Sequence, residues 1–255
     1  MKLLKPIILI VLFMFSYLHL FSQTEKQLVL GEQPIYKVAR AKEPIIVDGK
    51  MDEESWKNAE VRTLDYFFRR DEPLEKQQTK FRMLWDNNNI YLFYECEDIS
   101  LTARETRHDG SPSMDDCAEF FCIPYPDSLS IHFTFEINLY KVAMDCIVLW
   151  QYHDNRNFFI WDYNPVYEVG VTYDGTINDD TDVDKGWTME LAIPFKVFSN
   201  FSPARVGSKW AFQVCRQDRN KVNDRFRSTS TLFPTYDIKL DVHPPNRFGL
   251  MEFMP

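Results

Sequence analysis

Glycine is scarce in this sequence, with eight residues among 255. No glycine-rich phosphate-binding loop is present, and neither is a G-x-S-x-G turn that would expose a nucleophilic serine. The five histidines never take the H-E-x-x-H spacing that binds zinc on a helix. The sequence therefore has no ready-made motif for nucleotide binding, for this type of serine hydrolysis or for this type of zinc catalysis.

Positive charge is also in short supply. The chain has 29 Lys and Arg against 38 Asp and Glu, which gives a net charge of −9. Such a chain is repelled by nucleic-acid phosphates and by anionic membrane surfaces. We therefore expect no nucleic-acid partner.

The cysteines number five, so at least one thiol must be unpaired within the chain. Their spacing fits no zinc motif, and each lies in an apolar, strand-like run, which indicates buried thiols. Export of the chain would permit a disulfide, but the sequence leaves its connectivity open. The cysteines are Cys96, Cys117, Cys122, Cys146 and Cys215.

The N-terminal residues 1–23 have the layout of a secretory signal peptide. Lys2 and Lys5 precede an almost wholly apolar stretch at 7–20, and Ser22 supplies a small residue near a cleavage point. The apolar stretch is shorter than the roughly 20 residues of a membrane span, although an uncleaved anchor is an alternative. We expect an exported protein of the periplasm, cell surface or extracellular space, with no membrane span after cleavage.

Strict alternation of apolar and polar residues dominates the rest of the chain. Phe81, Met83 and Trp85 share one face of a run that ends in the Asn-rich turn 86–89, and a second alternating run follows at 90–97. Two such runs joined by a short turn predict a β-hairpin. The same period predicts further strands near 116–123, 130–138, 142–150, 166–174, 187–193, 210–218 and 247–253.

Helical signals are few. A short helix capped by Asp52 is expected at 52–59, and one turn opened by proline at 194–198. No internal repeat and no Gly/Ser- or Pro-rich linker divides the chain. We predict an all-β fold, a jelly-roll-like sandwich of two antiparallel sheets, that forms a single domain over residues 24–255.

Two carboxylates stand out because the strand pattern turns both away from the core. Glu119 lies in DDCAEFF and Glu136 in TFEIN. Within 130–138, the odd-numbered residues are expected to face the core and the even-numbered residues to face away. A pair of acids across strands could hydrogen-bond sugar hydroxyls, act in glycoside hydrolysis, or simply lie on a wet sheet face.

Aromatic residues make up 15% of the chain, and most of them must be core. Trp150 and Trp161 lie in the stretch LWQYHDNRNFFIWDYNP, where Asp, Asn and Arg stand beside them. A sugar ring needs such a combination of apolar faces for stacking and polar groups for its hydroxyls. The alternative is a long loop that its own aromatics hold against the sandwich.

The stretch DDTDVDKGW at 179–187 gathers four carboxylates. Asp180, Asp182 and Asp184 alternate like the first ligands of an EF-hand, but Lys185 stands where the required glycine should follow. An EF-hand is therefore excluded. A looser calcium site at Asp180, Asp182 and Asp184 and a solvated, self-capping turn are both compatible with the pattern.

Several of these segments recur together in one known family. They are IIVDGKMDEESWKNAE (45–60), FRMLWDNNNIYLFYECED (81–98), DDCAEFF (115–121), FEIN (135–138), INDDTDVDKGWTMELAIPF (177–195) and RFGLMEF (247–253). In this order they resemble the carbohydrate-binding module family 9 (CBM9)-like domains. The resemblance implies an exported sandwich of CBM9/DOMON-like fold that binds oligo- or polysaccharide without catalysis and serves polysaccharide catabolism.

The aromatic clamp of the sugar-binding family members is missing from this chain. Those members hold a terminal sugar between two tryptophans, and the corresponding segments here are 111–114 and 241–245, which contain none. Glu119 matches the family's glutamate, whereas Glu136 stands where the family has an arginine. The residues expected to contact a sugar instead are Glu119, Glu136, Arg104, His108, Asp109, Trp150, Trp161 and Arg216.

The resemblance also implies structural calcium, although no ligand set maps cleanly onto 180–184. Other functions stay open: a glycoside hydrolase that uses Glu119 and Glu136, with carboxyls about 5–9.5 Å apart, or an envelope interaction protein with a vestigial sugar cleft. Haem-binding relatives exist as well, but the chain lacks a C-x-x-C-H attachment motif. The oligomeric state is not determined by the sequence.

Overall fold

A computed structural model describes residues 34–67, 76–126, 131–153, 156–198, 204–223, 227–235 and 241–255. The expected signal peptide at 1–23 lies outside these ranges. Among the described residues, no helix is long and apolar enough to cross a membrane.

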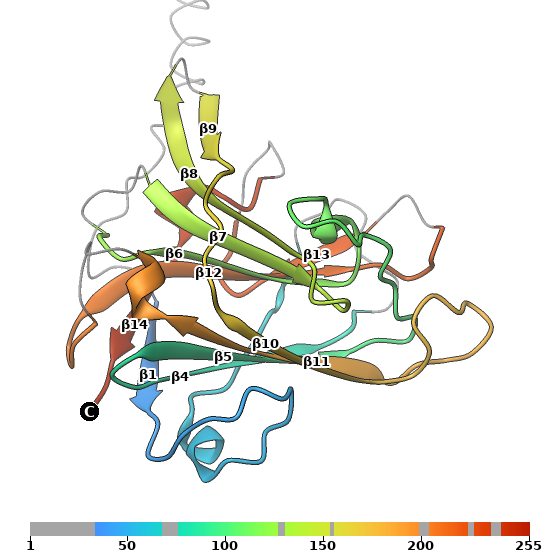
Figure 1. Cartoon of the computed structure of the whole chain (residues 1–255), viewed down its shortest axis with the longest axis horizontal. Helices are drawn as coiled ribbons and strands as arrows, with labels where there is room; N and C mark the ends of the chain where they lie inside the picture. Colours follow the sequence, from blue (N-terminus) through green and yellow to red (C-terminus); the bar gives the residue numbers. More distant parts are fainter. Residues whose placement is uncertain are drawn as a thin grey trace, which may run out of the picture.

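The described chain is almost entirely β-structure, arranged in two facing layers (Figure 1). The strands are β1 (Ile35–Arg40), β2 (Arg62–Thr63), β3 (Tyr66–Phe67), β4 (Thr79–Trp85), β5 (Asn89–Glu97), β6 (Cys117–Ile123), β7 (Ile131–Asn138), β8 (Ala143–His153), β9 (Arg156–Ile160), β10 (Glu168–Asp174), β11 (Gly186–Pro194), β12 (Lys209–Asp218), β13 (Ser228–Thr231) and β14 (Gly249–Phe253). Four 3₁₀ turns accompany them, namely η1 (Glu54–Asn58), η2 (Pro112–Met114), η3 (Phe195–Phe198) and η4 (Pro245–Arg247).

Strand β1 connects the two layers. Its residues 35–38 pair in parallel with β14, and Ala39 and Arg40 then pair in parallel with β4. We call the layer β14-β12-β6-β7-β8-β9, with β13 and β3, sheet A; sheet B is β10-β11-β5-β4, with β2. The remaining pairings are antiparallel, so the predicted two-sheet sandwich is confirmed, and β1 is the one departure from antiparallel order among the described strands.

The inner faces of both sheets meet in one aromatic-rich core. Phe120, Phe135 and Phe212 come from sheet A, while Phe81 and Tyr94 come from sheet B. The rings of Phe81 and Tyr94 lie edge to face with centroids 5.1 Å apart, a favourable geometry for the ring quadrupoles. All five cysteines are buried free thiols, as their apolar surroundings predicted.

The outer faces of the sheets are covered as well. On β7, the even-numbered residues from His132 to Asn138 do point away from the core, but they are at most 5% exposed, so this face is not wet. On sheet B, Trp56 of η1 packs against Phe93 at 5.4 Å. The expected helix at 52–59 is thus a short 3₁₀ turn, and Asp52 does not cap it, because its N-cap residue is Glu53 and no side chain caps it.

A buried carboxylate attaches the N-terminal loop to sheet B. Glu190 of β11 is 0% exposed, and its Oε2 accepts the backbone N–H groups of Asp48 and Gly49, each at 3.1 Å. Gly49 has a φ of +84°. The turn lies so close to β10 that a Cβ added to Gly170 would lie 2.3 Å from the backbone nitrogen of Gly49. The D-G turn therefore lies flat on the sheet, and Glu190 Oε1 has no partner among the described residues.

Burial raises the pKa of Glu190 to about 7. Because this folded-state pKa lies above the unfolded value, the protonated carboxyl favours the folded protein, and this stabilisation is lost as the pH rises from about 4.5 through 7. The Glu190→Gln variant keeps an acceptor for the turn and does not titrate. Its free energy of unfolding, measured in urea between pH 5 and 8, should fall less than that of the wild type, by up to about 3 kcal/mol.

The surface variant Glu54→Gln, whose carboxylate pairs with Lys57 in solvent, controls for the loss of one carboxyl. If the free energy of unfolding of Glu190→Gln changed with pH in parallel with that of the wild type, the raised pKa of Glu190 would be contradicted.

Candidate functional site

Glu119 and Glu136 are brought together by the register of sheet A. They are directly opposed on β6 and β7, and both point to the outer face of the sheet. Their exposed fractions are 1% and 5%. The two carboxyls predicted from the strand pattern therefore form one pair, but a nearly buried one.

A network of polar side chains on the same face holds this pair. Gln217 of β12 donates from Nε2 to Glu119 Oε1 at 2.7 Å. Its Oε1 in turn accepts Arg227 Nε at 2.9 Å and Thr229 Oγ1 at 2.6 Å. Sequence reasoning missed these three residues, and only the alternation of β12, which turns Gln217 to the face of Glu119, could have indicated the first.

The protonation of the pair follows from its burial. Burial raises the pKa of Glu119 to about 7, although the hydrogen bond from Gln217 opposes the rise. Burial, together with the charge of Glu119, raises the pKa of Glu136 well above its usual range. Near neutral pH the pair therefore holds at least one proton and presents both a donor and an acceptor.

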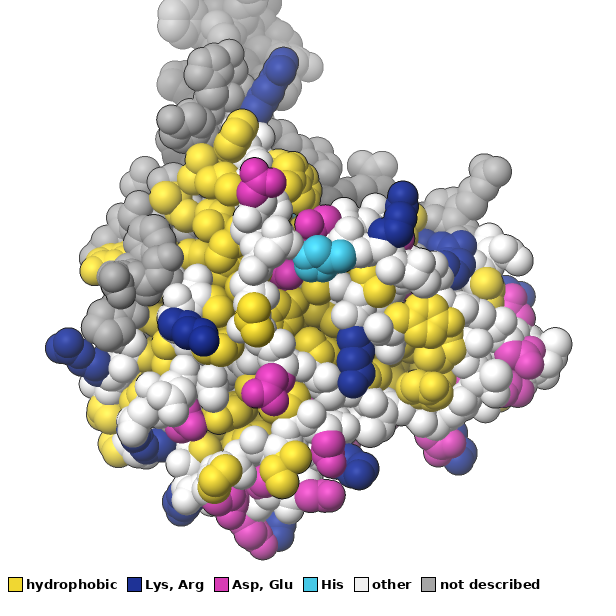
Figure 2. Space-filling model, viewed as in Figure 1, with side chains coloured by type: hydrophobic (Ala, Val, Ile, Leu, Met, Phe, Trp, Pro, Cys, Tyr) yellow, Lys and Arg dark blue, Asp and Glu magenta, His cyan; other side chains and the backbone are white. Residues whose placement is uncertain are grey.

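An aromatic pair with one exposed ring lies on the same outer face at the edge of sheet A. Phe159 of β9 stands opposite Val148 of β8, and its ring stacks on Trp161 at 5.1 Å with a 12° angle between the planes. Trp161 is 50% exposed. Three strand spacings, about 14 Å, separate β6 from β9, and Figure 2 shows apolar side chains gathered over β8 and β9.

The other expected stacker is not part of this arrangement. Trp150 is half-buried on β8, six residues beyond the residue that faces Glu136, which is about 20 Å along a strand. The connection after Trp161 is held to the sandwich as the alternative interpretation expected. Tyr163 packs against Phe133 at 5.4 Å, and its hydroxyl donates to Val197 O at 3.0 Å.

His108 and Asp109 lie in a loop beside the start of β8, near the carboxyl of Asp145. The backbone N–H of Asp109 donates to Ala143 O at 3.0 Å, and His108 Nε2 lies 2.5 Å from Asn164 Oδ1. The nearby Asp145 accepts the Tyr167 hydroxyl at 2.7 Å, and burial raises its pKa to about 6. Asp145 stands opposite Phe135 and thus points to the inner face, away from the Glu119–Glu136 pair.

Arg216 is not a surface residue, which corrects its assignment as a sugar contact. It is 1% exposed and points to the inner face, because β12 alternates and its neighbour Gln217 takes the outer face. Its Nη2 lies 3.0 Å from Asp98 Oδ2 and 3.4 Å from Asp218 Oδ1. Thr79 accepts from Nη1 at 3.1 Å, so the guanidinium is bound within the sandwich.

The same ion network contains the one group of carboxyls among the described residues that gathers closely enough for a metal, namely Asp98, Asp116 and Asp218. These groups do not fit calcium, which takes six to eight oxygen ligands. Arg216 lies against two of them, and Asp116 accepts the N–H groups of Thr102 at 2.6 Å and Arg219 at 2.8 Å. Bound donors and a guanidinium already use these oxygens.

The acidic stretch at 179–187 forms a loop rather than a site. Asp184 is 3% exposed and accepts the N–H groups of Leu101 at 2.6 Å and Thr176 at 2.8 Å. Asp182 is exposed, and Asp180 accepts the N–H of Val222 at 3.1 Å. The three carboxyls do not converge, which corrects their assignment as one calcium site, because Asp184 turns inward to hold two loops together.

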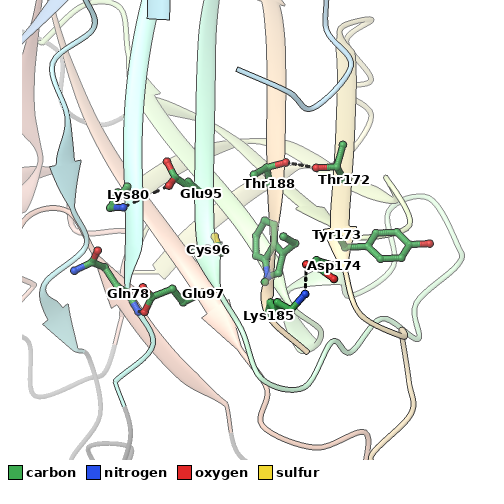
Figure 3. A pocket seen from close by; sticks show the side chains of 12 residues that line it. Gln78, Lys80, Glu95, Cys96, Glu97, Thr172, Tyr173, Asp174, Lys185 and Thr188 are labelled. Carbon is green, nitrogen blue, oxygen red and sulfur yellow. Dashed lines mark hydrogen bonds and ion pairs between the residues drawn. The ribbon is translucent and has the colours of Figure 1, made fainter. Parts of the chain in front are cut away.

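Sheet B carries a hollow of about 350 Å³ on its outer face (Figure 3). Its polar groups pair with one another: Lys80 lies 3.4 Å from Glu95, and Lys185 lies 2.7 Å from Asp174. Tyr173 points away from the hollow in Figure 3. Lys80, Glu95, Lys185 and Asp174 are thus paired with one another, and sheet A, where a carboxyl pair and an exposed tryptophan share one face, is the better candidate.

Comparison with known proteins places these features in context. The sequence profile described as carbohydrate family 9 binding domain-like matches residues 47–253. Among curated proteins, none matches this chain.

Solved structures share the fold at low sequence identity. A candidate carbohydrate-binding protein from Bacteroides uniformis is 17% identical, with a TM-score of 0.69 over 87% of this chain and 99% of that chain. A family 9 module from Caldicellulosiruptor kristjanssonii in complex with cellotriose is 16% identical, with a TM-score of 0.60 over 87% and 94%. A glucose complex of a family 9 module from that organism is also 16% identical, with a TM-score of 0.58 over 86% and 95%.

The buried ion network yields a stability prediction. Replacing Arg216 with Met leaves Asp98, Asp116 and Asp218 without their central cation, and breaking a buried pair in this way costs about 3–5 kcal/mol. Urea unfolding at pH 7 should show this loss. The control Lys185→Met removes an exposed pair with Asp174, whose side chains are 76% and 68% exposed, and should cost less than about 1 kcal/mol. Equal losses for the two variants would contradict the buried network.

Proposed function

Because the chain belongs to the carbohydrate family 9 binding domain-like family, we propose that it is an exported, non-catalytic protein that binds oligo- or polysaccharides. Its role is to recognise a glycan during polysaccharide breakdown. The observation that carries the proposal is the outer face of sheet A, where the facing residues Glu119 and Glu136 and the stack of Phe159 on Trp161 lie on the same side of the sheet.

The chemistry of this face suits a sugar. Glu119 and Glu136 have raised pKa values that favour protonation, so a sugar hydroxyl that reaches the pair meets both an acceptor and a donor. Arg227 and Gln217 extend the polar surface beside them. Trp161 offers an apolar face on which the C–H groups of a sugar ring can stack.

The site differs from the clamp of the family members that grip a sugar between two tryptophans. Met114, which is 40% exposed, stands in the first of the two segments, and the second segment, 241–245, has no tryptophan. The family 9 modules with bound cellotriose and glucose support a saccharide ligand. Because the clamp is missing, we expect the sugar to be held by polar groups and by stacking on a single tryptophan, Trp161.

Calorimetric titration with a panel of plant and algal oligosaccharides, neutral and acidic, tests the proposal. Trp161→Ala should weaken binding by about three- to tenfold, since an aromatic contact contributes about 0.5–1.5 kcal/mol beyond its area. The matched control is Tyr173→Ala on sheet B, whose side chain is 51% exposed against 50% for Trp161. Its affinity should equal that of the wild type.

Silence across the panel with an intact fold would refute the proposal. The same samples, analysed for shortened products, test the hydrolase alternative. Because Glu119 and Glu136 face each other in the register of β6 and β7, they are the pair that such an activity would use.

A further inference from the structure

Three arginines from separate segments converge on η2, beside the carboxyl pair. Arg219, which follows β12, donates from Nε to Met114 O at 2.5 Å. Arg227, which precedes β13, contacts Met114 Sδ through Nη1. Arg104 places Nε 3.6 Å from Asp115 Oδ1. In a chain with a net charge of −9, this concentration of guanidinium groups is a local exception.

Burial weakens the negative charge of the neighbouring acids. It raises the pKa of Asp116 and of Glu136 well above their usual ranges, which favours their neutral forms. Burial and then the positive charge of Arg104 lower the pKa of Arg219, as expected where guanidinium groups crowd together. Asp115 is a further nearby carboxylate, and the backbone N–H groups of Arg104 and Glu105 share its Oδ2 at 2.9 Å.

The arginines are continuous with the proposed sugar face and reach solvent. Arg227 donates to Gln217, which donates to Glu119. Glu119 Oε2 is buried and has no partner within the described ranges, so the network has capacity for a further hydrogen bond. The side chain of Arg104 is 41% exposed and Met114 is 40% exposed. A ligand on the carboxyl pair would therefore meet these guanidinium groups next.

We propose, on the basis of the proposed function, that the glycan is anionic and that its carboxylate or sulfate group binds Arg227 and Arg104. Guanidinium groups bind such oxyanions through paired N–H···O bonds, and a uronate and a sulfate ester share this chemistry. Arg219, which is 1% exposed, holds Met114 in place and adds charge without touching the ligand. A polyanion such as nucleic acid is disfavoured, because the acidic surface repels it while one charged substituent needs only the arginine cluster.

Calorimetric titration of the purified protein against matched ligands tests this inference. Trigalacturonic acid is compared with its methyl ester, and a sulfated galactan oligosaccharide with its desulfated form, so that each pair differs only at the charged substituent. We expect at least one charged form to bind about tenfold or more tightly than its neutral partner, as charge-assisted hydrogen bonds require. The preferred pair distinguishes a uronate from a sulfate ester, and the charged ligand should bind more weakly as salt increases.

Substitutions of Arg227 and Arg104 test whether these side chains bind the charged group of the ligand. Arg227→Gln and Arg104→Gln should each lower affinity for the charged ligand about three- to tenfold more than affinity for its neutral partner, because only the charged group depends on the guanidinium charge. Lys185→Gln, on sheet B, is the control and should bind as the wild type does. Arg104 is surface-exposed, so its variant tests the inference even if Arg227→Gln unfolds.

Equal binding of charged and neutral partners, or binding of neutral sugars alone, would overturn the anionic-ligand inference and leave the proposed function intact. A charge preference that neither arginine variant reduces would overturn the assigned site. Failure of the folded protein to bind any oligosaccharide would overturn both proposals.

Discussion

The buried ion network around Arg216 organises the end of the sandwich at which the proposed site lies. Its guanidinium joins Asp98, which follows β5 of sheet B, to Asp218, at the end of β12 in sheet A. Trp187 of β11 donates to the same Asp98 oxygen at 3.0 Å. A guanidinium buried among apolar strands needs these partners, because an unpaired charge there would be very costly. The two layers are therefore held in register at this end by electrostatics as well as by packing.

The network also extends outward to the sugar face. Asp116 accepts the N–H of Arg219 and that of Thr102, so it ties the chain after β12 to the segment before η2. Arg219 then holds η2 through Met114 O. The two faces of β12 thus stabilise different parts of the molecule. Arg216 secures the interior, while Gln217, one residue later, places the carboxyl of Glu119 on the exterior.

That exterior face is unusual because it is polar and nearly dry. Glu119, Glu136 and Thr134 are at most 5% exposed, and Gln217 and η2 lie against the strands that carry them. Burial favours protonated carboxyls, and this makes the pair a mixed donor and acceptor at neutral pH. The aromatic stack at β9 and the arginines at η2 flank this pair on opposite sides. A ligand that engages all three would lie across the strands, and its charge would decide which side binds most tightly.

Much of the fold could be predicted from the sequence, because a two-residue apolar period requires a sheet with one buried face. The strands from β4 to β8 and from β10 to β12 follow that pattern. Strand β1 was not predicted from the sequence, because it pairs in parallel with β14 and β4, which lie more than 200 and about 45 residues away along the chain. The pairing of Glu119 with Glu136 was expected from their faces, but their burial was not, because the covering segment has no local signal.

The sequence by itself determined the alternation of the strands, the family and the outward direction of Glu119 and Glu136 on their strands, whereas the pairing of β6 with β7 brought the two together. Only the tertiary structure decided that Arg216 belongs to the core, that Asp184 holds loops together instead of a cation, and that Arg219 and Arg227 meet at Met114 while Arg104 lies on the adjacent Asp115. The reason is physical. Periodicity acts between neighbours and assigns a residue to a face, whereas burial and charge pairing depend on which distant segment covers that face.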